Sequence, residues 1–158
     1  PFRQIYMELN GWTLSDQLYY KIGLDHFIDF AEKEIKAFTI PTQWVLELKN
    51  QSSLSVYFEI QEKITPIGNV DIVYNNQYVS LSYSYKGKWI FTGFFDQENK
   101  DGKVQDWLGS DLSWKINTKS MVSLFYGSQK GGLVCANGIC AEQPGFEDGM
   151  KLTYRTLF

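Results

Sequence analysis

Large apolar and polar residues alternate with a period of two along most of the chain. The clearest case is the segment Ala37–Asn50. One face of this segment carries Phe38, Ile40, Thr42, Trp44, Leu46 and Leu48, and the other carries Ala37, Thr39, Gln43, Glu47 and Lys49. Such alternation predicts a β-strand with two unlike faces. Its fourteen residues exceed the five or six that are usual for strands of globular proteins.

The same pattern recurs and predicts about nine antiparallel strands. We place them near residues 2–10, 17–28, 37–50, 53–62, 77–86, 88–96, 104–116, 119–127 and 148–158. Short turns are expected at Gln51–Ser52, Gly87 and Asn117–Thr118, and longer polar connections at Phe30–Lys36, Glu62–Gln77, Gln97–Lys103 and Gly127–Asp148. Short turns at one end and long loops at the other are typical of an up-and-down transmembrane β-barrel.

The last strand carries its charge on one face only. Phe158, Thr156, Tyr154, Leu152 and Met150 share one face, and Leu157, Arg155, Thr153 and Lys151 share the other. If the first face lies in lipid, Lys151 and Arg155 point into a lumen, where charge is tolerated. The reverse placement would cost about 2–4 kcal/mol for each charge near the midplane of a bilayer. The charges therefore favour a terminal aromatic that faces lipid.

Extending this orientation to all strands divides the candidate residues into two sets. The set expected to face a lumen is polar: Lys21, Gln43, Glu47, Lys49, Glu59, Gln61, Ser80, Ser82, Ser84, Lys115, Lys151 and Arg155. The set expected to face lipid is apolar or aromatic: Phe38, Ile40, Trp44, Leu46, Leu48, Leu54, Val56, Phe58, Ile60, Val79, Leu81, Tyr83, Leu112, Trp114, Leu152, Tyr154 and Phe158.

Composition is compatible with this interpretation and excludes others. The 158 residues suffice for one domain, 16% of them are aromatic, and the net charge of −3 gives no basic surface for nucleic acid. The sequence lacks a run of 18 apolar residues, which excludes a transmembrane helix. Barrel strands need only about 9–11 residues, of which every second one is apolar.

The strand number suggests a piece of a larger barrel. The sequence begins at Pro1, directly in a predicted strand, without a signal segment. Nine strands are an odd number, whereas single-chain bacterial barrels have even numbers. We therefore expect residues 1–158 to form the C-terminal portion of one outer-membrane β-barrel whose upstream strands are missing.

Two cysteines, Cys135 and Cys140, flank the turn dipeptide Asn137-Gly138. This spacing favours a small disulfide-closed loop in an oxidising compartment. A metal site is the alternative, but it would need further ligands, and the single histidine, His26, is distant in sequence.

Two segments resemble known proteins. The last strand, with Tyr154 and Phe158, resembles the C-terminal signal that the barrel-assembly machinery recognises in outer-membrane proteins. Residues 126–140, followed by Pro144 and Phe146, resemble the last external loop of a family of large bacteroidete-type outer-membrane proteins. That resemblance implies an outer-membrane location and supports the disulfide. It brings no catalytic residue, because the family has no assigned activity.

The sequence shows no catalytic motif: it has no G-x-S-x-G, no P-loop and no H-E-x-x-H. We expect no enzymatic activity, no cofactor and no metal site. Paired acids such as Asp25 and Asp29 are interpreted as solvated loop charge, and His26 as a surface or interface residue. The tryptophans are Trp12, Trp44, Trp89, Trp107 and Trp114, and they fit an aromatic girdle at the membrane interfaces better than a sugar-stacking platform.

The leading hypothesis is a bacterial outer-membrane β-barrel with a structural, transport or partner-docking role. Its expected partners are outer-membrane lipid, the remaining strands of the same barrel, and other outer-membrane or periplasmic subunits, without nucleic acid. A second hypothesis is a secreted β-sandwich that binds carbohydrate through its tryptophans. A third is a thiol–disulfide role for Cys135 and Cys140, to be tested by Cys135→Ser.

Overall fold

The protein is built from antiparallel strands. A computed structural model describes residues 2–30, 35–67, 70–136, 139–143 and 145–156, and at residues 2, 67, 132–136 and 139–143 it describes the backbone alone. Its strands are β1 (Phe2–Thr13), β2 (Leu18–Asp29), β3 (Ile35–Leu48), β4 (Ser52–Ile67), β5 (Val70–Tyr85), β6 (Trp89–Lys100), β7 (Lys103–Lys115), β8 (Ser120–Gln129), β9 (Gly132–Ala136), β10 (Ile139–Gln143) and β11 (Phe146–Thr156).

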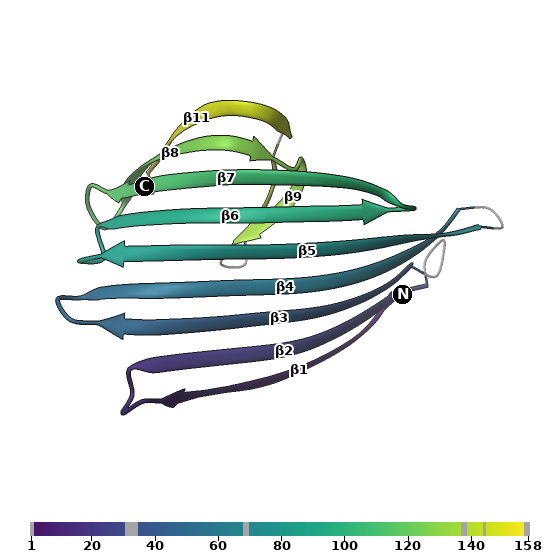
Figure 1. The fold of residues 1–158 in the computed structure, drawn as a ribbon, viewed down its shortest axis with the longest axis horizontal. Coiled ribbons are helices and arrows are strands. Elements are labelled where there is room, and N and C mark those ends of the chain that lie inside the picture. The colour runs from purple at the N-terminus through teal and green to yellow at the C-terminus, as the bar shows by residue number, and fades with distance from the viewer. Residues whose placement is uncertain (1, 31–34, 68–69, 137–138, 144, 157–158) are drawn as a thin grey trace.

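Nine of these strands form one up-and-down sheet, which confirms the all-β prediction and the expected strand number (Figure 1). Each strand pairs with its neighbour in sequence, in the order β1-β2-β3-β4-β5-β6-β7-β8-β11. Strands β9 and β10 form a separate hairpin between β8 and β11, and the sequence pattern did not predict it. The sheet is open, with β1 and β11 as its edge strands.

The register carries the predicted alternation across the whole sheet. Opposite residues of an antiparallel pair project to the same side. Val56 lies between Trp44 of β3 and Leu81 of β5, so apolar side chains continue from strand to strand. Ser55 lies between Val45 and Ser82 on the other side. The sheet therefore has one apolar face and one polar face.

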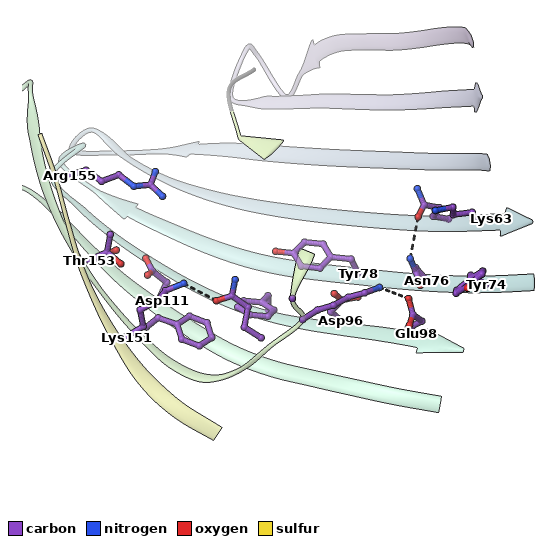
Figure 2. Close-up of a pocket in the computed structure, with 17 residues that line it drawn as sticks. Lys63, Tyr74, Asn76, Tyr78, Asp96, Glu98, Asp111, Lys151, Thr153 and Arg155 are labelled. Carbon is purple, nitrogen blue, oxygen red and sulfur yellow. Dashed lines mark hydrogen bonds and ion pairs between the residues drawn. The ribbon is translucent and has the colours of Figure 1, made fainter. Parts of the chain in front are cut away.

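The sheet is curved, and β8 and β11 arch over its C-terminal end (Figure 1). A bulge marks this bend, because the register of β11 against β8 shifts between Phe146 and Gly149. Gly127 adopts φ = +130° here, and a Cβ at this position would lie 2.3 Å from the carbonyl oxygen of Leu108. Only glycine meets both conditions. The polar face is the concave one, since its side chains surround a hollow (Figure 2).

Two of the predicted long connections are wrong. Strand β4 continues to Ile67 and β5 begins at Val70, so most of Glu62–Gln77 is paired sheet. Strands β6 and β7 are joined at Asp101 and Gly102 alone, both with positive φ, so Gln97–Lys103 is a tight hairpin. In both segments polar residues interrupt the apolar face: Glu62, Asn75 and Gln97 lie on it, although Ile64 and Val73 do as well. The period-two pattern is lost there, so the segments resemble loops in sequence. The sequence predicted short turns at one end of the sheet and long loops at the other. In the structure the two ends differ mainly because the strands extend further at one of them.

Few side chains are buried. Phe125, at 6% exposure, is the one apolar residue in the described part of the chain that reaches the buried class. The accessible surface is 11231 Å², whereas a compact soluble monomer of 18.3 kDa would expose about 8,100 Å². Apart from the small β9–β10 hairpin, the described strands form a single sheet rather than the two packed sheets of a sandwich. No second layer of described residues covers the apolar face.

Candidate functional site

The concave face encloses a hollow of about 690 Å³ (Figure 2). Its walls come from β4, β5, β6, β7, β8 and β11 and from the segment that follows β8. The lining combines aromatic rings, amides and charges of both signs: Gln61, Lys63, Tyr74, Asn76, Tyr78, Phe94, Asp96, Glu98, Asp111, Ser123, Phe125, Gln129, Lys130, Gly131, Lys151, Thr153 and Arg155. This composition suits a polar ligand that also has apolar surface.

A row of aromatic rings crosses the floor of the concave face. We call it the aromatic row, and its members are Tyr57, Tyr78, Phe94, Phe125 and Phe146. Successive ring centroids lie 5.9, 6.0, 5.8 and 5.4 Å apart, within the range of favourable aromatic pairs. The row runs from β4 through β5, β6 and β8 to β11, so it links strands that are distant in sequence.

Strand β7 contributes no ring to the row, because Gly109 occupies that place. Its register partners are Phe94 of β6 and Gly127 of β8. A Cβ on Gly109 would lie 2.7 Å from the Cζ atoms of both Phe94 and Phe125. The missing side chain lets these two rings approach each other above β7.

An ion pair fastens the segment after β8 to the concave face. The Lys130 Nζ atom lies 2.6 Å from Glu98 Oε2, and the two side chains are 30% and 17% exposed. The same ammonium group lies 5.4 Å from the ring centroid of Trp107. These contacts hold the start of the β8–β11 connection at the rim of the hollow.

A chain of amides continues the wall beside Glu98, because Asn76 of β5 is its register partner and Gln61 of β4 is the next. Asn76 Nδ2 donates a hydrogen bond to Gln61 Oε1 at 3.2 Å, and Gln61 Nε2 donates to Thr39 Oγ1 at 3.2 Å. These bonds fix the orientation of the Asn76 amide. Its Oδ1 atom is buried and accepts no hydrogen bond from the described residues.

A second polar network lies on the concave face of β1 and β2. Lys21 Nζ lies 2.8 Å from Glu8 Oε2, and Glu8 also accepts hydrogen bonds from Tyr6 and Asn10. Tyr6 and Lys21 line a smaller hollow with Gln43. Polar side-chain pairing thus extends over the concave face as far as the open edge at β1.

The residues predicted to face a lumen share the concave face. Gln61, Lys151 and Arg155 line the large hollow, and Lys21 and Gln43 line the smaller one. The others lie along the same face in register, except for one in a turn: Glu47, Glu59, Ser80, Ser82, Ser84 and Lys115 on the face, and Lys49 in the turn before β4.

The residues predicted to face lipid share the convex face, and many of them are exposed. Leu81, for example, is 52% exposed. Trp89 and Trp114 stack at 5.4 Å on this face, with an interplanar angle of 8°. The strand register places Trp12 and Trp107 on the concave face, so the five tryptophans do not form one belt. Phe158 lies outside the described residues.

The backbone sets Cys135 opposite Cys140 in the pairing of β9 with β10, while both side chains lie outside the described part. The part of the chain that the structure describes contains no group of three or more metal-ligating side chains. It also contains no helix long and apolar enough to cross a membrane.

Sequence reasoning missed most of the hollow. The unpredicted lining residues with the clearest roles are Asn76, Tyr78, Phe94, Glu98 and Lys130. The alternation of β5 and β6 could have placed the first four on the concave face. On β5, for example, Tyr78 continues the every-second-residue series of Ser80, Ser82 and Ser84 toward the N-terminus. Lys130 depends on the path of the chain after β8, which no periodicity encodes.

Comparisons of the chain with protein-family models, curated protein sequences and solved structures gave no match.

Proposed function

We propose that this chain forms part of a transmembrane β-barrel of the bacterial outer membrane, with its convex face in lipid and its concave face toward a lumen. The observation that carries the proposal is the separation of side chains between the two faces. The convex face exposes leucine, isoleucine, valine and aromatic side chains from β1 to β11. Monomeric soluble proteins rarely expose apolar patches beyond a few hundred Å².

The height of the apolar band supports the proposal. On the convex side of β4 the apolar residues extend from Leu54 to Ile60, between Ser52 and Glu62. Ten steps of about 3.3 Å separate those two polar residues, roughly 33 Å along the strand. A tilt of about 40° reduces this to about 25 Å, the height of the apolar band in outer-membrane barrels.

Beyond this band polar side chains enter the convex face, interspersed with smaller apolar ones such as Ile64, Val73 and Val104. Glu62, Asn75, Gln77, Gln97 and Asp106 are neighbours in register on the distal parts of β4 to β7. Gln97 Nε2 donates a hydrogen bond to Asp106 Oδ1 at 2.8 Å. These strand ends would extend into water on the side of the membrane opposite the turn before β4. Paired strands would replace the flexible loops that a shorter barrel has there.

The open edges require further strands. Unpaired N–H and C=O groups cost several kcal/mol each in hydrocarbon, so a sheet in lipid must close. In an up-and-down sheet of nine strands, β1 and β11 run in the same direction, and they cannot pair antiparallel with each other. The proposal therefore includes an odd number of additional strands between them, in keeping with even-numbered barrels.

The proposed role is passive: passage of a solute through the lumen, or docking of a partner, without catalysis. Fractionation of cells expressing the full gene product tests the location. We expect the protein in the outer-membrane fraction, dependent on detergent for extraction, with a gel mobility that changes on heating. A protein that is monomeric and stable in detergent-free buffer would overturn the proposal.

A further inference from the structure

The aromatic row lies in the middle of the concave face, where most of the other side chains are polar. Tyr78, Phe94 and Phe125 all line the large hollow. Tyr74 of β5 lines it as well, and Figure 2 labels it together with Tyr78. We propose that this hollow binds a neutral oligosaccharide. The inference rests on the proposed function, since the concave face would be the water-filled lumen, and it specifies which class of solute the lumen accepts.

The rings supply one half of the recognition. A pyranose presents a face of C–H groups and a rim of hydroxyls, so a sugar site needs flat apolar surfaces bordered by hydrogen-bonding groups. Tyr78 and Phe94 are half-buried, which leaves part of each ring for contact with a ligand. Their planes meet at 25° in a stacked arrangement, with centroids 6.0 Å apart. The row continues from Phe94 to Phe125, so apolar ring surface extends over several strands and suits a chain of sugar units better than one small polar molecule.

The amides beside the rings supply the other half. Asn76 Oδ1 is buried without a donor among the described residues, while Nδ2 of the same amide is engaged by Gln61. A buried acceptor of this kind is satisfied when a hydroxyl donates to it. The carboxylates of Asp96 and Asp111 also line the hollow and accept from hydroxyls. A sugar rim provides several such donors at once.

The charges favour a neutral ligand over an anion. The cationic side chains of the hollow are Lys63, Lys130, Lys151 and Arg155, and the acidic ones are Asp96, Glu98 and Asp111. Lys130 is paired with Glu98 at 2.6 Å, and Lys151 Nζ donates to Gln129 Oε1 at 3.0 Å. The near balance of charge leaves no strong field to select phosphate or sulfate groups.

Binding of two neutral hexasaccharides, maltohexaose and cellohexaose, to the detergent-solubilised full-length protein tests this inference by calorimetry. We expect at least one of them to bind, and Phe94→Ala to raise its Kd at least tenfold. Asn76→Ser should raise the Kd several-fold without removing a ring from the row. Trp89→Ala is the matched control, because it removes an aromatic from the stacked pair on the convex face, and its Kd should equal that of the parent protein.

Heat-dependent gel mobility establishes that each variant is folded before binding is measured. The inference is overturned if the folded parent protein binds neither hexasaccharide, or if Phe94→Ala and Asn76→Ser both bind as the parent does. These outcomes are separate from failure of the proposed function. A protein that needs no detergent contradicts the membrane location, whereas an outer-membrane protein that binds neither sugar contradicts this inference alone.

Discussion

The convex and concave faces are made by the same strands, yet their side chains interact in opposite ways. On the concave face polar groups pair with one another, as in the Ser82–Thr92 hydrogen bond of 2.9 Å and the Lys130–Glu98 ion pair. On the convex face the hydrogen bonds of Gln97 with Asp106 and of Ser120 with Thr156 lie toward the ends of strands, outside the apolar residues. One period-two sequence thus builds two faces with different interactions.

The strongest test of this comparison places the same charge on each face, at two adjacent residues. Leu81 and Ser82 are neighbours on β5 but point to opposite faces. Leu81→Arg should lower the free energy of unfolding by about 2–4 kcal/mol, because it puts a charge in the middle of the apolar band. Ser82→Arg should cost within about 1 kcal/mol, mainly through the lost hydrogen bond to Thr92. Urea unfolding in lipid vesicles measures both.

Equal effects of the two arginines would show that both faces meet water, and the assignment of lipid to the convex face would be abandoned. A larger effect of Ser82→Arg would reverse the assignment, so that the concave face would be the one in lipid.

A second, smaller test uses two glycines. Gly109 lies beneath the aromatic row, whereas a Cβ on Gly93, on the convex face, would have nothing within 4 Å. Gly109→Ala should destabilise the sheet by about 1–3 kcal/mol, since Phe94 and Phe125 must separate to admit the methyl group. Gly93→Ala should be neutral, or stabilising by up to about 1 kcal/mol, because it restricts the unfolded chain.

Thermal unfolding in detergent compares the stability of the two alanine variants with that of the parent protein. If Gly109→Ala is as stable as the parent, the rings do not depend on the gap above β7, and the aromatic row is not the organising feature of the concave face.

The smallest effect on the sheet is expected from the β9–β10 hairpin, whose strands do not pair with the nine-stranded sheet. Opposite residues of an antiparallel pair have Cα atoms about 4.5–5.5 Å apart. Disulfides span about 4.4–6.8 Å. We therefore expect Cys135 and Cys140 to resist maleimide labelling until a reductant is added. Cys135→Ser should change the unfolding free energy of the nine-stranded sheet by less than about 0.5 kcal/mol. Labelling of both thiols without reductant would contradict the bond.

The alternation of residues was sufficient to predict nine strands and the face on which each side chain lies. Leu54 to Ile60 illustrate why: a strand with one apolar and one polar face has a pattern of period two that no helix shares. The extensions of β4 to β7 escaped prediction because Glu62, Asn75 and Gln97 are polar on the convex side as well. There the period-two pattern disappears while the backbone pairing continues.

The site was harder to predict than the fold. The aromatic row needs rings from five strands, and its members are spaced along the sequence without a common period. Their meeting depends on the register of each hairpin and on the bulge between Phe146 and Gly149, which shifts β11 relative to β8. Register is determined by turn geometry and cross-strand packing together. The sequence pattern alone contains neither.

The long connection between β8 and β11 also affects the order in which the strands join the sheet. Most neighbouring strands of the sheet are joined by only a few residues, such as the three between Leu48 and Ser52, but sixteen separate Gln129 from Phe146. Closing the longer loop costs about 1.5 kcal/mol more chain entropy, by the logarithmic dependence on loop length. We expect β11 to join the sheet last and its amides to exchange with deuterium first. The contacts of Phe146 with the aromatic row would then form in the final step of folding.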